Sequence, residues 1–213
     1  MARRTKEDAA QTREAILDAA VQVFHEKGVS RSSLEEIARR AGVTRGAVYW
    51  HFAHKRDVLQ AMGMRVDALL GDRRERMLRE AESDPMAAMR SFLHFLTGDL
   101  LEDDHVRTIL DVFFHRCEYV DEMREFKEFV DDEKASRHRE MVSIFERARA
   151  QGQVRQDMTA EDCAVMTKTM LEGILRTTLL DVWPCGLRGT TMSNARRIDF
   201  LLESLGYRIP PAA

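Results

Sequence analysis

The sequence predicts an all-α chain, with a three-helix N-terminal domain and a larger helical C-terminal domain. Apolar residues recur at spacings of three and four, which is the period of amphipathic helices. The chain has only four prolines and shows no strand-like alternation of useful length. With 213 residues and 44% hydrophobic content, it can bury a substantial core. We expect the first domain to span residues 10–70 and the second to span 71–213.

The first sixty residues predict three helices, each with sequence signals for where it starts or ends. A helix over about 8–27 carries an apolar stripe and stops at Gly28, since glycine readily adopts the turn after a helix. Ser33, followed three residues later by an acidic residue, has the pattern of a capping box for a short helix that ends near residue 41. Gly42 then provides a turn, and Thr44 offers an N-cap hydroxyl for another short helix over about 45–51.

Two short helices joined by a glycine-containing turn and packed on a longer one form a helix-turn-helix, here over about 33–52. The N-terminal residues of its second helix are then placed to face the major groove of double-stranded DNA. The planar guanidinium of arginine can donate two hydrogen bonds to a guanine edge, and glycine lets the protein backbone come close to a phosphate. Aromatic side chains with a donor group can contact the sugar-phosphate backbone, and lysine can pair with a phosphate. The predicted DNA contacts are Ser33, Thr44, Arg45, Gly46, Ala47, Tyr49, Trp50, His51 and Lys55.

Charge distribution agrees with a polyanion partner for this end of the chain. Residues 1–60 carry 11 Lys and Arg against 8 Asp and Glu, whereas the remainder carries 22 against 28. The N-terminal part is therefore +3 and the rest −6. Arg3, Arg4 and Lys6 form a basic arm that could add charge or enter a minor groove.

Two stretches, FHEKGVSRSSLEEIARRAGVTRGAVYWHF and HKRDVL, resemble the DNA-binding domain of the TetR family of transcriptional regulators. The start MARRTK and the stretch FFHRCEYVDEM at 113–123 resemble the AcrR and TtgR branch of multidrug-efflux repressors. The resemblance implies a two-domain, all-helical homodimer that represses transcription from an inverted-repeat operator. It also implies release of the operator when a small molecule enters the C-terminal domain.

The helices that follow can supply an apolar pocket for such an inducer. We expect helices over about 55–80, from Asp84-Pro85 onward, over 104–119 and over 121–150. In the first of them Asp67 lies between two glycines, and a lipophilic cation such as a drug, dye or biocide would suit a buried carboxylate. The alternative is a solvated Asp67 paired with a residue such as Arg74. The predicted inducer contacts are Met62, Val66, Asp67, Leu93, Leu96, Leu110, Phe113, Phe114, Met141, Leu171, Glu172, Leu175 and Arg176.

The last two helices, predicted over about 159–182 and 190–205, are apolar on more than one face. One face would bury the chain's own core, and the other would meet a second subunit in a four-helix interface. We therefore expect a homodimer, with Leu175 and Leu202 in its interface.

Other functional classes find little support in the sequence. No complete catalytic or metal-binding motif is present, since Glu102 with His105 and His51 with His54 lack further ligands at suitable spacing, so we expect no enzyme activity, metal or cofactor. The three cysteines, Cys117, Cys163 and Cys185, are far apart and are expected to be reduced. No apolar run could span a membrane, and we expect a cytoplasmic protein without membrane partners. A helical carrier that binds small molecules without touching DNA is the alternative function.

Overall fold

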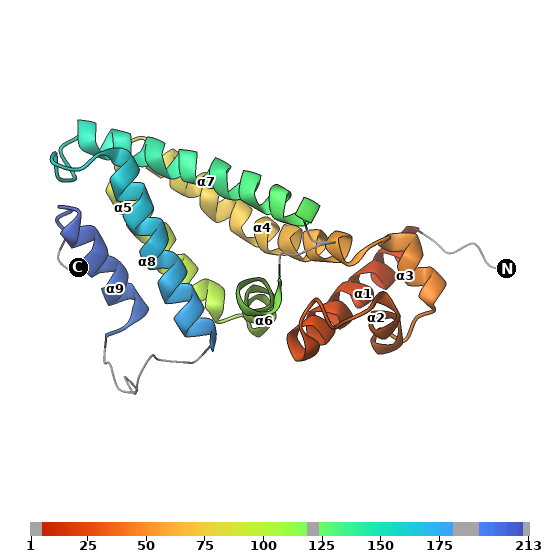
Figure 1. Cartoon of the computed structure of the whole chain (residues 1–213). Coiled ribbons are helices and arrows are strands. Elements are labelled where there is room, and N and C mark those ends of the chain that lie inside the picture. The colour runs from red at the N-terminus through yellow and green to blue at the C-terminus, as the bar shows by residue number, and fades with distance from the viewer. Residues whose placement is uncertain (1–5, 119–123, 181–191, 211–213) are drawn as a thin grey trace. The chain divides into compact units, whose positions relative to one another are not determined.

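The computed structural model describes residues 6–118, 124–180 and 192–210, and every regular element in these ranges is a helix (Figure 1). The all-α prediction is therefore confirmed. The calls on Arg3, Arg4 and Cys185 lie outside the described residues. The elements are α1 (Lys6–Lys27), α2 (Leu34–Arg40), α3 (Arg45–His51), α4 (Lys55–Glu80), α5 (Pro85–Thr97), η1 (Asp99–Leu101), α6 (Asp104–Asp111), η2 (Val112–Arg116), α7 (Arg124–Ala150), α8 (Ala160–Leu180) and α9 (Asn194–Ser204).

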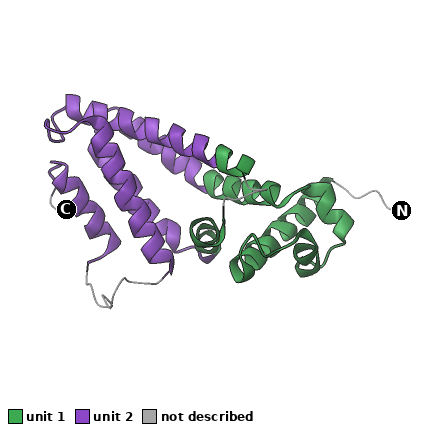
Figure 2. Ribbon diagram, in the orientation of Figure 1, with its two compact units in different colours: residues 1–68, 105–129 green, residues 69–104, 130–213 purple. Residues whose placement is uncertain are grey.

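The chain forms two compact units (Figure 2). The first, which we call the head, contains residues 1–68 and 105–129, and the second, the body, contains residues 69–104 and 130–213. The expected division placed everything after residue 70 in the second domain. Residues 105–129 instead pack with the head.

The head is built on α1, which packs against α2, α3 and η2. Its core side chains are apolar and almost fully buried, because each helix turns one apolar stripe inward. They include Ile16, Leu17, Val21, Phe24, Ile37, Val48, Phe52, Val58, Leu59 and Met62.

The segment from 105 onward joins the head for two physical reasons. Val106, Ile109 and Val112 on one face of α6 and η2 are buried. In addition, the Val29 amide, just after α1, donates a 2.9 Å hydrogen bond to the Arg116 carbonyl. Where one continuous helix was predicted over 104–119, the structure has α6 followed by the single π-helical turn η2.

The body has its own apolar core, in which α5, α8 and α9 pack on one another. The Asp84-Pro85 start of α5 is confirmed, since Asp84 Oδ1 accepts a 3.1 Å hydrogen bond from the Ala87 amide. Gly206 ends the last helix at φ +97° and leaves no room for a side chain. A Cβ there would lie 2.8 Å from the Arg155 nitrogen.

Several large apolar side chains are exposed on α8 and α9. Val165, Met166 and Met170 on α8 are exposed, and Phe200 on α9 is 58% exposed. Leu202, predicted in the subunit interface, is instead fully buried in the core of the body. Leu175, the other predicted interface residue, is half-buried, and its place in an interface stays a prediction. Periodicity finds both apolar faces of a helix but cannot tell which one turns inward.

None of the helices in the described ranges is long and apolar enough to cross a membrane.

Candidate nucleic-acid interface

The predicted capping box at the start of α2 is present. Ser33 Oγ accepts a 3.3 Å hydrogen bond from the Glu36 amide, and Glu36 Oε2 accepts a 3.0 Å bond from the Ser33 amide. Lys27 also forms an ion pair with Glu36, and this hydrogen bond lowers the pKa of the Glu36 carboxyl. Ser33 is thus occupied as a cap and half-buried, so a DNA contact from its hydroxyl stays a prediction.

The turn between α2 and α3 depends on Gly42, whose φ is +67°. Its amide donates to the Arg39 carbonyl, and the amide of Val43 donates to the Ala38 carbonyl at 3.0 Å. These two bonds form a Schellman motif, which uses a left-handed residue after the last helical turn. Because that conformation suits glycine, the sequence fixes the direction in which the chain enters α3.

The short helix α3 presents its first turn outward. Thr44 caps it, with Oγ1 accepting a 3.2 Å bond from the Ala47 amide. Val48 faces the core of the head and is fully buried, whereas Thr44, Arg45 and Gly46 are exposed. The inward and outward faces therefore fall where the helix-turn-helix interpretation requires them.

Arg45 is held in place on this surface by two neighbours. Its Nη2 lies 3.0 Å from Oε1 of Glu35 on α2, and its guanidinium carbon lies 5.2 Å from the centre of the Tyr49 ring. The Tyr49 hydroxyl donates a 3.3 Å hydrogen bond to the same Glu35 oxygen. Sequence reasoning proposed Arg45 and Tyr49 but missed Glu35, because a contact across the turn leaves no periodic signal.

Two more predicted contacts form an aromatic pair at the end of α3. Trp50 is 73% exposed, and its ring meets His51 edge to face at a centroid distance of 4.4 Å. An exposed indole, with an apolar ring and an N–H donor, suits contact with a sugar-phosphate wall.

Lys55, predicted as a phosphate contact, is engaged within the head. Its Nζ donates a 3.0 Å hydrogen bond to the Val29 carbonyl in the loop between α1 and α2. The side chain therefore joins the start of α4 to that loop, and its contact with phosphate stays a prediction.

The predicted inducer contacts divide between the two units. In the head, Met62 and Val66 are buried, Leu110, Phe113 and Phe114 are half-buried, and Asp67 is exposed. In the body, Leu93 is buried, Arg176 is exposed, and Leu96, Met141, Leu171, Glu172 and Leu175 are half-buried. The expectation of a buried Asp67 carboxylate is not met, because its side chain lies at the surface. Convergence of these residues on one cavity stays a prediction.

The glycine near Asp67 that the sequence singled out has a packing role. A Cβ on Gly63 would lie 3.7 Å from Cζ of Phe113, so the ring lies directly against the helix backbone. The Phe113 ring also stacks on Phe126, with ring centroids 6.3 Å apart. The Phe113 ring therefore packs beside α4 where Gly63 has no side chain.

A polar cluster at η2 was not foreseen from the sequence. The buried carboxylate of Asp111 receives His115 Nδ1 at 2.8 Å, Arg116 Nε at 3.1 Å and His25 Nε2 of α1 at 3.3 Å. Nε2 of His115 is buried without a hydrogen-bond partner among the described residues. Because π-helical turns frequently mark functional sites, this unsatisfied nitrogen is a candidate ligand contact.

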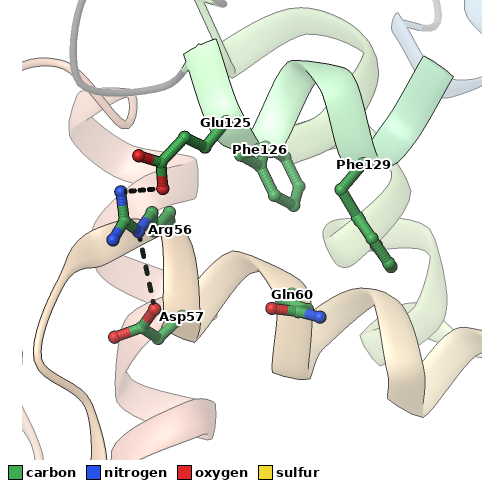
Figure 3. Close-up of a pocket in the computed structure, with 6 residues that line it drawn as sticks. All are labelled: Arg56, Asp57, Gln60, Glu125, Phe126 and Phe129. Atoms are coloured by element: carbon green, nitrogen blue, oxygen red, sulfur yellow. Dashed lines mark ion pairs between the residues drawn. The ribbon is translucent and has the colours of Figure 1, made fainter. Parts of the chain in front are cut away.

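The head also contains a small pocket between the first two turns of α4 and those of α7 (Figure 3). Its volume is about 180 Å³, and Arg56 forms ion pairs with Glu125 and Asp57 beside it. None of the predicted inducer contacts lines it. The lining residues are Arg56, Asp57, Gln60, Glu125, Phe126 and Phe129.

Known proteins resemble both parts of the chain. Residues 16–62 match the model of the bacterial regulatory proteins of the tetR family, and residues 84–193 match that of the C-terminal region of MAATS-type transcriptional repressors. The HTH-type transcriptional regulator TtgR of Pseudomonas putida is 35% identical over 184 residues, which cover 84% of this chain and 86% of TtgR.

Solved structures agree over nearly the whole length. NalD, described as the secondary repressor of the MexAB-OprM multidrug efflux pump in Pseudomonas aeruginosa, has a TM-score of 0.77 at 32% identity, over 94% of this chain and 96% of its own. A complex of SmeT with triclosan has a TM-score of 0.74 at 29% identity, over 95% and 96%. SmeT is described as the repressor of the Stenotrophomonas maltophilia multidrug efflux pump SmeDEF.

Proposed function

The chain belongs to the TetR family of transcriptional regulators, and we propose that it represses a multidrug-efflux operon and leaves its operator when a small lipophilic molecule binds. Family membership confirms the prediction of a helix-turn-helix regulator rather than an enzyme. The carrier without DNA binding is not favoured.

The observation that carries the DNA-binding role is the outer face of α3. An arginine, a glycine and two aromatic residues are exposed there, while Val48 on the opposite face anchors the helix in the head. Such a helix can enter a major groove and present Arg45 to a base edge.

A homodimer would supply the two reading helices that an inverted repeat requires. The large apolar side chains exposed on α8 and α9 support this assembly, because a second subunit could bury them. Phe200, Val165, Met166 and Met170 replace Leu202 as the proposed contacts in the interface.

For the inducer, the unsatisfied His115 nitrogen supports a lipophilic molecule that carries a hydrogen-bond donor. Since Nδ1 faces the Asp111 carboxylate, Nε2 of a neutral His115 would accept a bond from a phenol. SmeT, a similar protein, has been solved with triclosan. A cationic drug, dye or biocide remains part of the proposal through Asp67, which at an exposed site would act as a peripheral rather than a buried anchor.

The test begins by selecting duplexes from a randomised library with the purified protein. Enrichment of an inverted repeat is expected, and a failure to enrich any repeat would contradict the proposed function. Triclosan and the cationic dye crystal violet are then titrated against the enriched duplex, with release followed by fluorescence anisotropy. His115→Leu should raise the triclosan concentration needed for release, whereas His105→Leu, an exposed histidine on α6, should leave it unchanged. Equal release of parent and His115→Leu by triclosan would remove His115 from the inducer site.

A further inference from the structure

The proposed reading surface contains a carboxylate where a polyanion would approach. Glu35 lies on α2, and its Oε1 interacts with both Arg45 Nη2, at 3.0 Å, and the Tyr49 hydroxyl, at 3.3 Å. The Arg45 guanidinium also lies over the Tyr49 ring at 5.2 Å. Three side chains from two helices are thus mutually in contact around one oxygen atom.

The fold of the head does not need this cluster. The Arg45 and Glu35 side chains are 68% and 41% exposed, and exposed ion pairs contribute little to stability. Both helices already have their own caps, at Ser33 and at Thr44. The core that packs them together is made of other residues, among them Ile37 and Val48. A role in stability therefore does not account for the arrangement.

Recognition of a base by arginine depends on the orientation of the guanidinium plane. A free arginine side chain samples many rotamers, and fixing them on binding costs conformational entropy. Here Glu35 engages one end of the guanidinium and Tyr49 supports its face. The guanidinium has five N–H donors, so donors remain for the edge of a guanine.

We propose that Glu35 is a positioning residue that sets the base specificity of Arg45, an inference that rests on the proposed DNA-binding function. Glu35 and Tyr49 hold the guanidinium in the orientation in which it reads a base. The Glu35 carboxylate also repels phosphates, and at a wrong site Arg45 has no base partner to offset that repulsion. Specificity then comes from two effects together, the attraction of Arg45 to the correct base and the repulsion between Glu35 and the phosphates.

The two effects predict opposite changes when the charge is removed. Glu35→Gln keeps the shape of the side chain but loses its ability to hold the guanidinium as an ion pair. Binding to a non-specific duplex should strengthen, because one negative charge has left the surface, while binding to the enriched duplex should weaken or stay constant. The ratio of the two affinities should fall by about threefold to tenfold.

The matched control is Glu26→Gln, which removes an ion pair of similar exposure in the head, between Glu26 and Arg40. Selection from the randomised library is repeated with both variants, and affinities for the enriched duplex and for poly(dI·dC) are measured at two salt concentrations. Glu35→Gln should relax the preference at one base pair in each half-site, and Glu26→Gln should not. Glu35→Asp, which keeps the charge, should restore part of the preference. Thermal midpoints of both variants should match the parent.

A double variant tests whether Glu35 acts through Arg45. In an Arg45→Ala background, Glu35→Gln should have no further effect on base preference. Parent and Glu35→Gln proteins that enrich the same sequence with the same selectivity would overturn this inference and leave the proposed function intact. A parent protein that enriches no sequence would instead contradict the proposed function itself. A loss of preference that is as large in Glu26→Gln would assign the effect to net charge and overturn the positioning role.

Discussion

The head and the body of this chain use their surfaces in opposite ways. On the head, α3 buries Val48 and exposes a polar and aromatic face that includes Arg45 and Trp50. On the body, α8 and α9 bury apolar side chains in the core and also expose large ones, including Phe200. The head therefore exposes a polar and aromatic surface, whereas the body exposes apolar side chains suited to burial against a partner.

An aspartate introduced into α9 should have opposite consequences at a buried and at an exposed position. Leu202 and Phe200 are two residues apart on α9, yet the first is fully buried and the second is 58% exposed. Leu202→Asp should destabilise the protomer by about 4 kcal/mol or more, since a charge would be buried without a partner. Urea unfolding followed by circular dichroism measures this effect.

Phe200→Asp is the control, because the new charge would stay in water within one protomer. It should keep the helical circular dichroism of the folded protomer but sediment as a monomer, and its urea midpoint should fall only by the stabilisation that dimerisation gives the parent. If it remains an intact dimer in sedimentation velocity, the exposed face of α8 and α9 does not form the subunit interface.

Arg45→Ala tests the corresponding surface of the head. It should cost roughly 1–3 kcal/mol of affinity for the enriched duplex and blur selectivity at one base pair in each half-site. The urea midpoint should hardly change, since the Arg45 side chain is 68% exposed. Unchanged affinity and selectivity in an anisotropy titration would show that α3 does not dock as proposed.

Two glycines provide a smaller contrast between the units. Gly42→Ala should destabilise the head by about 1–2 kcal/mol, because φ is +67° at that position and a Cβ disfavours the left-handed region. Gly71→Ala, in the part of α4 that belongs to the body, meets nothing within 4 Å and should stabilise by about 0.5–1 kcal/mol. Thermal unfolding measures both. Equal signs for the two changes would contradict the assignment of Gly42 to a left-handed turn.

The smallest effect concerns acid stability of the body. Arg90 hydrogen-bonds Asp199 at 2.7 Å, and this contact, followed by a 2.8 Å contact with His94, lowers the pKa of the Asp199 carboxyl. The pKa of Asp199 is lower in the folded protein than in the unfolded chain. The ionised carboxylate therefore stabilises the fold at pH values above the unfolded-state pKa. This stabilisation is lost as the pH falls through the folded-state pKa. Asp199→Asn should therefore lose less than 1 kcal/mol at pH 7 and show a shallower decline below about pH 4. If urea unfolding shows the same decline of the unfolding free energy below about pH 4 for both proteins, Asp199 does not have this role.

The helix-turn-helix could be predicted from the sequence because its signals are local. Each cap and turn forms through hydrogen bonds between residues at most five positions apart. The capping box of Ser33 and Glu36, the turn at Gly42 and the cap at Thr44 are all present in the structure. The contact between Glu35 and Arg45 joins two helices through surface side chains, and nothing in the spacing of the residues indicates it.

The body was less predictable for a related reason. Apolar periodicity located its helices but could not distinguish buried Leu202 from exposed Phe200 as the residue free to meet a partner. Nor could it show that α6 packs in the head, or that the helix after Asp111 becomes a π-helical turn. Both outcomes depend on residues far apart in the sequence, such as His25 and Asp111.

Val29 lies in the short connection between α1 and α2, and both its backbone N–H and its backbone C=O form hydrogen bonds to distant parts of the head. Its amide donates to the Arg116 carbonyl, and its carbonyl accepts from Lys55 Nζ. Surface connections usually tolerate inserted residues during evolution. An insertion here would move Val29 out of register with one bond or both, so natural variation in this loop should change side chains while keeping its length constant.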